Sequence, residues 1–236
     1  MDAPSLTLDG VSITRADTVR YLGVTVDSTL SYRAHTVAVC AKVKKSVCAL
    51  HRTFKRCVSV SVLCTLFKVL LRVSLLYCCE TTYPTFACDR LRLERTQKFA
   101  CRLLLGDFRQ TSSYDGLLSE LRMQALWRTV FTRRLCLIHF YVTAHRHCPA
   151  DLLTLAHTHN PHLSTRKNHK NSILIPCCKR VSPFIASSFA YNSLPPTIVT
   201  LSPSKFKTAI SNDSVFNDVC LKLFNTKYDF VTLNYT

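Results

Sequence analysis

The chain has 236 residues, of which 47% are hydrophobic, so it can bury a substantial core and is not composed like a disordered protein. Lys and Arg number 31 against 14 Asp and Glu, and this net charge of +17 favours a polyanionic partner, with an ordinary basic soluble protein as the alternative. Thirteen cysteines, in a chain whose first residues lack the pattern of a secretory signal, predict buried, reduced thiols in an intracellular, reducing compartment, either nucleus or cytoplasm.

Two runs near the N-terminus alternate as β-strands do. Residues 6–13 alternate around Asp9-Gly10, which is a strong turn signal and predicts a hairpin. Residues 18–32 continue the alternation but place Gly23 in its middle. Because glycine weakens a strand interior, Gly23 predicts a bulge or the close approach of another backbone.

Residues 30–54 change to a helical period, since Cys40, Val43 and Val47 recur at spacings of three and four. A stripe of cations lies roughly opposite this apolar face and could lie along phosphates. The alternative is that these cations are ordinary solvated side chains. The stripe consists of Lys42, Lys45, Arg52 and Arg56.

The most apolar segment, residues 58–79, predicts a second helix over about residues 60–78. It is long enough to span a bilayer, but Lys68 and Arg72 near its centre would each cost about 2.5 to 3.5 kcal/mol there. We therefore expect a buried helix of a soluble protein and no membrane partner.

Three further helices are predicted over residues 88–107, 113–121 and 126–142. The first of them has Gly106 as its C-terminal stop signal. One face of this helix is basic and is a second candidate for contact with nucleic acid. This face consists of Arg95, Lys98 and Arg102.

The sequence changes character at residue 149. Residues 150–156 suggest one more short helix, residues 157–171 an exposed histidine-rich loop, and residues 214–224 a terminal helix. The predicted fold class is mainly α, with an N-terminal β-hairpin (1–29), a helical bundle (30–148) and a loop-rich C-terminal region with short helices (149–236).

No constellation of catalytic or metal-binding residues stands out. The carboxylates are scattered singly on turns and helix starts, where capping is their usual role. The histidines and cysteines of residues 145–178 do not have the spacing of a zinc site, and a solvated loop is the better interpretation. Four isolated glycines cannot form a phosphate-binding loop. We expect no catalytic residue, metal or cofactor in this chain.

Several segments occur in an order that resembles the C-terminal part of jockey-like non-LTR (LINE-type) retrotransposon reverse transcriptases, which are RNA-directed DNA polymerases. The resemblance covers about residues 5–210. The segments are VRYLGVTVDSTLSYRAH (19–35), LLRVSLLYCC (70–79), RLERTQKFACRLLLGD (92–107), SYDGLLSELRMQALWRTVFTRRL (113–135), SSFAYNSLPPTI (187–198) and SPSKFKTAI (202–210).

This resemblance implies that Tyr21, Leu22 and Gly23 form the primer-grip hairpin at the end of the palm, and that the helices from residue 30 onward form the thumb. His35 matches a histidine common early in the first thumb helix. The expected partner is an RNA or DNA primer–template duplex, and the fingers and the rest of the palm would be the natural packing partner. The catalytic aspartates and their Mg²⁺ belong to the intact polymerase and are expected upstream of the hairpin.

Four positions depart from the family pattern. Cys78 stands where a small Gly or Ala is expected, Thr82 where Trp is expected, and Arg122 where Gly is expected; Tyr191 replaces the usual Trp before Asn-Ser-Leu-Pro. Two other interpretations therefore stay open besides a duplex-binding polymerase fragment without catalysis. The chain could be a decayed relic, or a helical module adopted for binding another protein.

Overall fold

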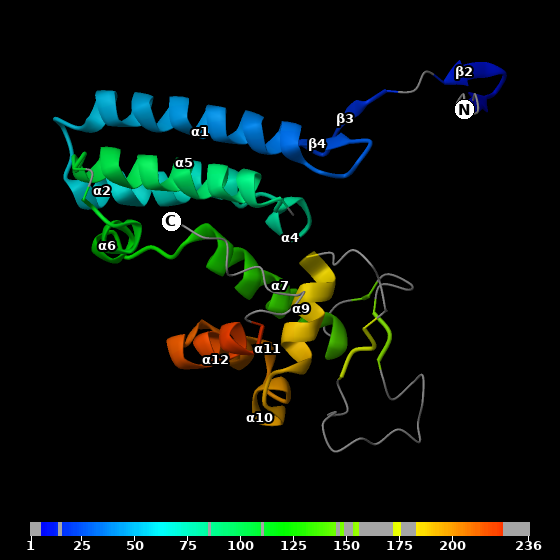
Figure 1. The fold of residues 1–236 in the computed structure, drawn as a ribbon. Helices are drawn as coiled ribbons and strands as arrows, with labels where there is room; N and C mark the ends of the chain where they lie inside the picture. The colour runs from blue at the N-terminus through cyan, green and yellow to red at the C-terminus, as the bar shows by residue number, and fades with distance from the viewer. Residues whose placement is uncertain are drawn as a thin grey trace.

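The computed structural model describes residues 6–13, 16–84, 86–109, 111–144, 147–148, 153–155, 172–175 and 183–223. The fold is mainly α, with two small antiparallel hairpins followed by helices and a loop-rich C-terminal region (Figure 1). The fold class expected from the sequence is confirmed.

The N-terminal hairpins differ from the prediction in one respect. The first turns at Asp9-Gly10, as expected, but Gly23 lies in the turn of the second hairpin, where Tyr21 pairs with Val24. The expectation of a glycine inside one strand is wrong, because two four-residue strands alternate just as one longer strand does. The strands are β1 (Leu6–Leu8), β2 (Val11–Ile13), β3 (Thr18–Tyr21) and β4 (Val24–Asp27).

The side chain of Asp27 organises the connection from the second hairpin to α1 (Arg33–Phe54). Its carboxylate accepts hydrogen bonds from the backbone N–H groups of Thr29 (3.1 Å), Ser31 (2.9 Å) and Tyr32 (2.7 Å). The Thr29 hydroxyl donates to the same carboxylate, and these bonds hold the pKa of Asp27 at about 2. Helix α1 therefore begins at residue 33, because residues 28–32 are fixed in a loop around Asp27.

The expected second helix is interrupted. One π-helical turn, in which each hydrogen bond reaches one residue further than in an α-helix, divides it in two. The side chain of Lys68, within this turn, donates to the carbonyl oxygen of Leu121 (2.8 Å), and that of Arg72, directly after it, donates to the carbonyl oxygen of Gln124 (2.9 Å). The elements of this segment are α2 (Val60–Leu66), η1 (Phe67–Leu71), α3 (Arg72–Leu75) and α4 (Cys79–Thr82).

The sequence predicts a buried helix for this segment, but the structure buries only one of its faces. One face contributes Leu63 and Phe67 to the core, while Val69, Leu70 and Val73 are more than half exposed. Within the part of the chain that the structure describes, no helix has both the length and the apolar character to cross a membrane.

The next three helices follow the prediction closely. Helix α5 (Ala87–Leu105) ends at Gly106, whose φ of 68° is the left-handed conformation typical of a helix stop. Helix α6 (Tyr114–Glu120) starts at Ser113, whose hydroxyl accepts from the Gly116 N–H. Helix α7 (Leu126–Val142) has the expected bounds.

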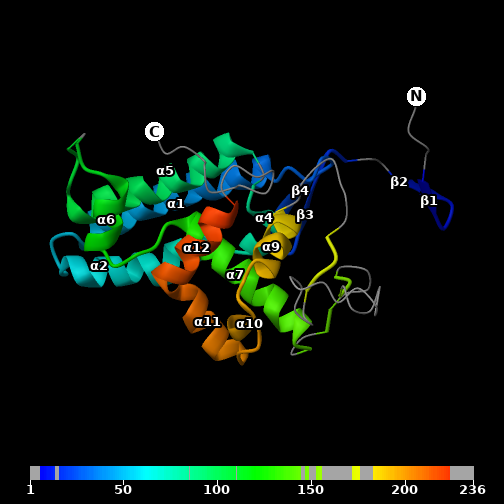
Figure 2. The same ribbon diagram turned by 60° about the horizontal axis from the view of Figure 1, so that its bottom comes forward.

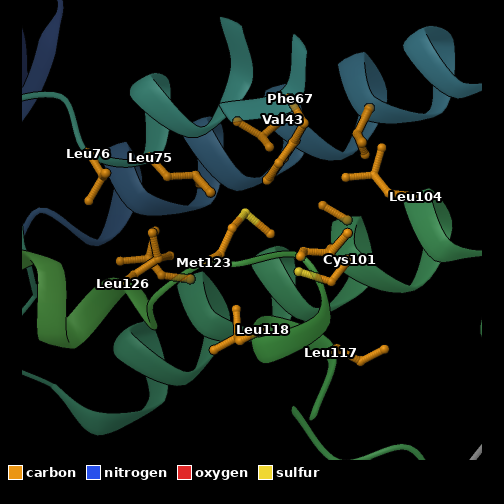
Figure 3. Close-up of a cluster of buried hydrophobic side chains, with 14 of the residues drawn as sticks. Val43, Phe67, Leu75, Leu76, Cys101, Leu104, Leu117, Leu118, Met123 and Leu126 are labelled. Atoms are coloured by element: carbon orange, nitrogen blue, oxygen red, sulfur yellow. The ribbon is translucent and has the colours of Figure 1, made fainter. Parts of the chain in front are cut away.

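Two clusters of buried side chains form the core. In the first, residues from α1, η1, α3, α5, α6 and the start of α7 converge, among them Val43, Phe67, Cys101 and Leu126 (Figure 3). The second cluster joins later residues of α7, such as Leu135, to the C-terminal helices. In both ribbon views α1 and α5 lie side by side (Figure 2), and α7 packs against α5 and against C-terminal helices.

The C-terminal region is built from short helices around α7. The described residues of the expected helix 150–156, which are residues 153–155, are not helical, and Leu155 is bridged to Ile173, so this prediction is wrong there. The histidine-rich loop 157–171 lies outside the described residues. The terminal helix is confirmed. The helices are α9 (Pro183–Asn192), α10 (Pro196–Val199), α11 (Pro203–Ser211) and α12 (Asp213–Leu223).

Polar side chains attach these short helices to the rest of the fold. The amide of Asn192 pairs with both backbone groups of Ile173, at 2.9 and 2.8 Å. Tyr191, fully buried, lies with its hydroxyl 3.0 Å from Nδ1 of His139 on α7, and Nε2 of the same ring lies 2.9 Å from the Leu201 carbonyl. Because a carbonyl only accepts, Nε2 carries the proton and Nδ1 accepts from Tyr191. The Asn-Ser-Leu-Pro segment thus has a structural role.

Candidate nucleic-acid interface

The turn of the second hairpin presents the three residues expected to grip a primer. Leu22 and Gly23 both have positive φ, 45° and 84°, which is the conformation of a two-residue type I′ turn. Tyr21 and Leu22 are 67% and 73% exposed. The hairpin therefore offers an exposed aromatic and an exposed aliphatic side chain at its tip.

Tyr77, which the sequence did not single out, holds this turn. Its hydroxyl donates to the Leu22 carbonyl at 2.8 Å, and its ring lies 3.6 Å from the position that a Cβ at residue 23 would occupy. That distance is an ordinary contact, so glycine is required at this position by its φ. Tyr77 lies 55 residues further along the chain, and no local pattern announces such a contact.

His35 connects the hairpin to α1. The residue is 8% exposed, and its Nδ1 accepts from the Thr25 backbone N–H at 3.3 Å. Burial lowers the pKa of His35 below its ordinary value, so the neutral ring that can accept this bond is favoured. His35 therefore joins the hairpin to the first helix, and Tyr77, between α3 and α4, holds the hairpin tip.

The predicted basic stripe lies along the exposed side of α1. Lys42, Lys45 and Arg52 are exposed on the face opposite Val43 and Val47, which are buried. Arg56 is also exposed but follows the end of the helix, in the turn that leads to α2. The helix carries no acidic residue.

The second basic group lies on α5 but is less accessible. Arg95 is exposed, whereas Lys98 and Arg102 are half-buried. Arg102 donates to the Arg109 carbonyl at 3.1 Å, so its guanidinium also supports the loop that follows α5. Among the described residues no hydrogen bond or ion pair links this group to the stripe on α1. The two basic groups therefore lie on separate helices without a direct connection.

The distribution of acidic residues distinguishes this part of the surface. Residues 33–105 contain fourteen Lys and Arg against three acidic residues, Glu80, Asp89 and Glu94. Asp89 and Glu94 are 0% and 2% exposed. Glu80 is half-buried, and its carboxylate lies 3.7 Å from the Arg133 guanidinium. The exposed cations on these helices therefore have no exposed carboxylate from the same segment among them.

The two buried acids have structural partners. Glu94 accepts hydrogen bonds from the Leu126 and Trp127 N–H groups, at 3.2 and 2.7 Å, and from the Tyr114 hydroxyl at 2.6 Å, so it caps the start of α7. Burial raises the pKa of Glu94 and these bonds oppose the rise. Asp89 lies 3.2 Å from the Arg33 guanidinium. Neither acid is available to a ligand at the surface.

This arrangement can bind an extended polyanion, because exposed cations attract phosphates and release their counterions. Within the described residues no group of three or more His, Cys, Asp or Glu side chains could hold a metal ion. Most of the histidines considered for zinc lie outside those residues.

Comparisons of the chain with models of protein families, with characterised proteins and with solved structures found no match.

Proposed function

We propose that this chain binds a nucleic-acid duplex as the primer-grip and thumb region of an RNA-directed DNA polymerase of the non-LTR retrotransposon type, and that it does not carry the catalytic carboxylates of that polymerase. The hairpin tip would contact the primer strand, and the cations of α1 would contact phosphates. Its natural ligand would be an RNA or DNA primer–template duplex.

The observation that carries duplex binding is the exposed basic surface of residues 33–105, whose acids are buried or paired with Arg133. A soluble basic protein usually intersperses charges of both signs on its surface. Here the stripe cations Lys42, Lys45 and Arg52 lie along one face of α1. With a helical rise of about 1.5 Å per residue, the distance along the axis from Lys42 to Arg52 is about 15 Å.

The polymerase origin draws support from two backbone positions. Cys78 and Arg122 both have a φ of 50°, the left-handed conformation that favours glycine. Cys78 stands where the polymerase pattern has a small residue, Gly or Ala, and Arg122 where it has Gly. A chain descended from such a polymerase would keep these backbone turns after the small residues were replaced.

The binding test is a salt series. We expect the purified chain to bind a fluorescently labelled RNA–DNA hybrid duplex in anisotropy measurements, with affinity falling linearly in log[salt]. Changing Lys42, Lys45 and Arg52 to Ala should each lower the salt slope by about one. Lys44→Ala is the matched control, because Lys44 is exposed on the same helix but points about 115° away from the stripe, at about 3.6 residues per turn.

An equal loss of slope in the Lys44→Ala variant would contradict a defined interface on α1. A chain that does not bind duplex at low salt would contradict the proposed function itself. The absence of catalytic carboxylates is tested separately, by offering a primed RNA template with Mg²⁺ or Mn²⁺. DNA synthesis by the purified chain would overturn that part of the proposal.

A second candidate function is protein binding, and the exposed apolar face of η1 and α3 favours it. Val69, Leu70 and Val73 are 62%, 57% and 54% exposed on neighbouring turns, which is unusual for a surface without a partner. If this is the main role, a pulldown from cell extract should retain a partner after nuclease treatment, and substitution of Val69 and Val73 by Ser should release it.

A further inference from the structure

A cleft of about 490 Å³ lies along α7, between α4 and α11, and takes no part in the interface proposed above. Cys136, Leu137 and Phe140 of α7 form the apolar part of its lining, and Arg133 of α7 and Lys207 of α11 contribute cations. Its volume falls in the range of small-molecule sites, about 300 to 1,000 Å³.

The α7 residues that line the cleft lie on one face of the helix. Arg133, Cys136, Leu137 and Phe140 have the spacing i, i+3, i+4 and i+7. The opposite face of α7 packs into the second hydrophobic cluster, with Leu135 0% exposed. The cleft is therefore a feature of the outer side of a well-anchored helix, and substitutions in it need not disturb the core.

The cleft has one positive charge in excess. Arg133 donates to the Leu76 carbonyl at 3.1 Å and lies 3.7 Å from the Glu80 carboxylate, so its charge is already largely offset. Lys207 is exposed, and its ammonium group has no hydrogen bond or ion pair with any described residue. It lies close enough to Cys136 that its ammonium opposes the rise in the thiol's pKa caused by burial.

We propose that this cleft binds a small amphiphilic anion, an aromatic or aliphatic body that bears one carboxylate, sulfonate or phosphate. The apolar body would lie on Leu137 and Phe140, where contact removes apolar surface from water. The anionic group would lie at Lys207, where a charge-assisted hydrogen bond is stronger than a neutral one. Neither interaction uses a residue of the α1 stripe or of the hairpin tip.

The test uses the full chain and 8-anilino-1-naphthalenesulfonate as the probe, since this dye combines an aromatic body with a single anionic group. A fluorescence titration should saturate with one site per chain. Lys207→Glu should weaken binding at least tenfold, whereas Lys205→Glu, an exposed residue of the same helix outside the cleft lining, should leave it unchanged. Equal effects of the two substitutions, or binding that does not saturate, would overturn the proposal.

A second measurement locates the dye without a substitution. The dye should slow alkylation of Cys136, followed by peptide mass spectrometry, and should leave Cys48 unaffected. Cys48 is a suitable control because it is also half-buried but lies on α1. Equal protection of both thiols, or none at Cys136, would show that the dye binds elsewhere and would refute the assignment.

Discussion

At the scale of single residues, the junction between the second hairpin and α1 depends on the protonation state of two side chains. Asp27 must be ionised to accept the N–H groups of residues 29, 31 and 32, and His35 must be neutral to accept the Thr25 N–H. Both requirements are met near neutral pH. The orientation of the exposed tip, Leu22 and Gly23, relative to the helix follows from these two groups together with Tyr77.

The His35 contact predicts a pH dependence with a definite sign. Burial lowers the pKa of His35 in the folded chain, whereas the unfolded chain has the ordinary value of about 6.5. As pH falls below about 6.5 the unfolded state takes up this proton first, so the free energy of unfolding decreases until the folded pKa is passed. Above pH 6.5 this contribution is fully present.

Urea unfolding at pH 7.5 and pH 5.5 measures this effect. The His35→Gln variant is the control, because a glutamine oxygen can accept the Thr25 N–H but does not titrate. The difference in the free energy of unfolding between wild type and variant should therefore shrink at the lower pH. An equal difference in this free energy at both pH values would contradict the role assigned to His35.

At the scale of the elements, the ends of the helices explain several connections. Helix α6 is followed by Arg122, which has the left-handed conformation two residues beyond Glu120. The Met123 N–H donates to the Leu118 carbonyl at 2.8 Å, five residues back. This is the Schellman type of helix end, at which glycine is the usual residue. Met123 is buried in the first cluster, so the end of α6 and the start of α7 are fixed together.

Replacing Arg122 by Gly should stabilise the fold, because a non-glycine residue at positive φ costs about 1 kcal/mol. We expect the free energy of unfolding to rise by about 0.5 to 1 kcal/mol in denaturant titrations. Ala49→Gly, at an exposed right-handed position of α1, should lower it by about 1 kcal/mol. A loss of stability in Arg122→Gly would show that the arginine side chain has a structural role of its own.

The sequence predicted best those elements whose signals are local. The stop of α5 at Gly106 and the full extent of α7 follow from turn chemistry and from one uninterrupted helical period. The π turn at residues 67–71 was missed, because one extra residue hardly changes the apolar spacing. The alternation pattern missed the turn at Leu22-Gly23, because strands of four residues are too short to separate by alternation, and only the family resemblance implied a hairpin there.

The candidate interface was predictable only in part, for a related reason. Helical spacing placed Lys42, Lys45 and Arg52 on one face of α1, and the structure shows them exposed there. The burial of Glu94 was not predictable, because it depends on Tyr114 and on the start of α7, which reach it only in the folded chain. The absence of exposed acids from residues 33–105 therefore emerges from tertiary packing.

At the scale of the whole molecule, α7 belongs to both hydrophobic clusters. Leu126 and Val130 are buried in the first, and Phe131 and Leu135 in the second. Trp127, the one tryptophan of the sequence, packs against both. Loss of either cluster would expose one side of this helix, so the two are coupled through a shared element.

We therefore expect a single unfolding transition. Thermal melts followed by Trp127 fluorescence and by far-UV circular dichroism should coincide. Leu135→Ala, which truncates a fully buried side chain of the second cluster, should lower the free energy of unfolding by about 2 to 5 kcal/mol and shift both melts together. Two separated transitions would contradict the coupling, and a melt without cooperativity would favour the decayed relic.

The π turn between α2 and α3 has a consequence for how this chain tolerates change in length. Removing one residue from Phe67–Leu71 would convert the π turn into a regular α turn and leave α3 in nearly its present orientation relative to α2, because a π turn accommodates one extra residue. Inserting one residue into the regular helix Val60–Leu66 would instead rotate everything beyond it by about 100°. Arg72 would then no longer meet Gln124, and the hydroxyl of Tyr77 would turn away from Leu22. A one-residue insertion in this helix would thus release the hairpin tip without altering any residue that touches it.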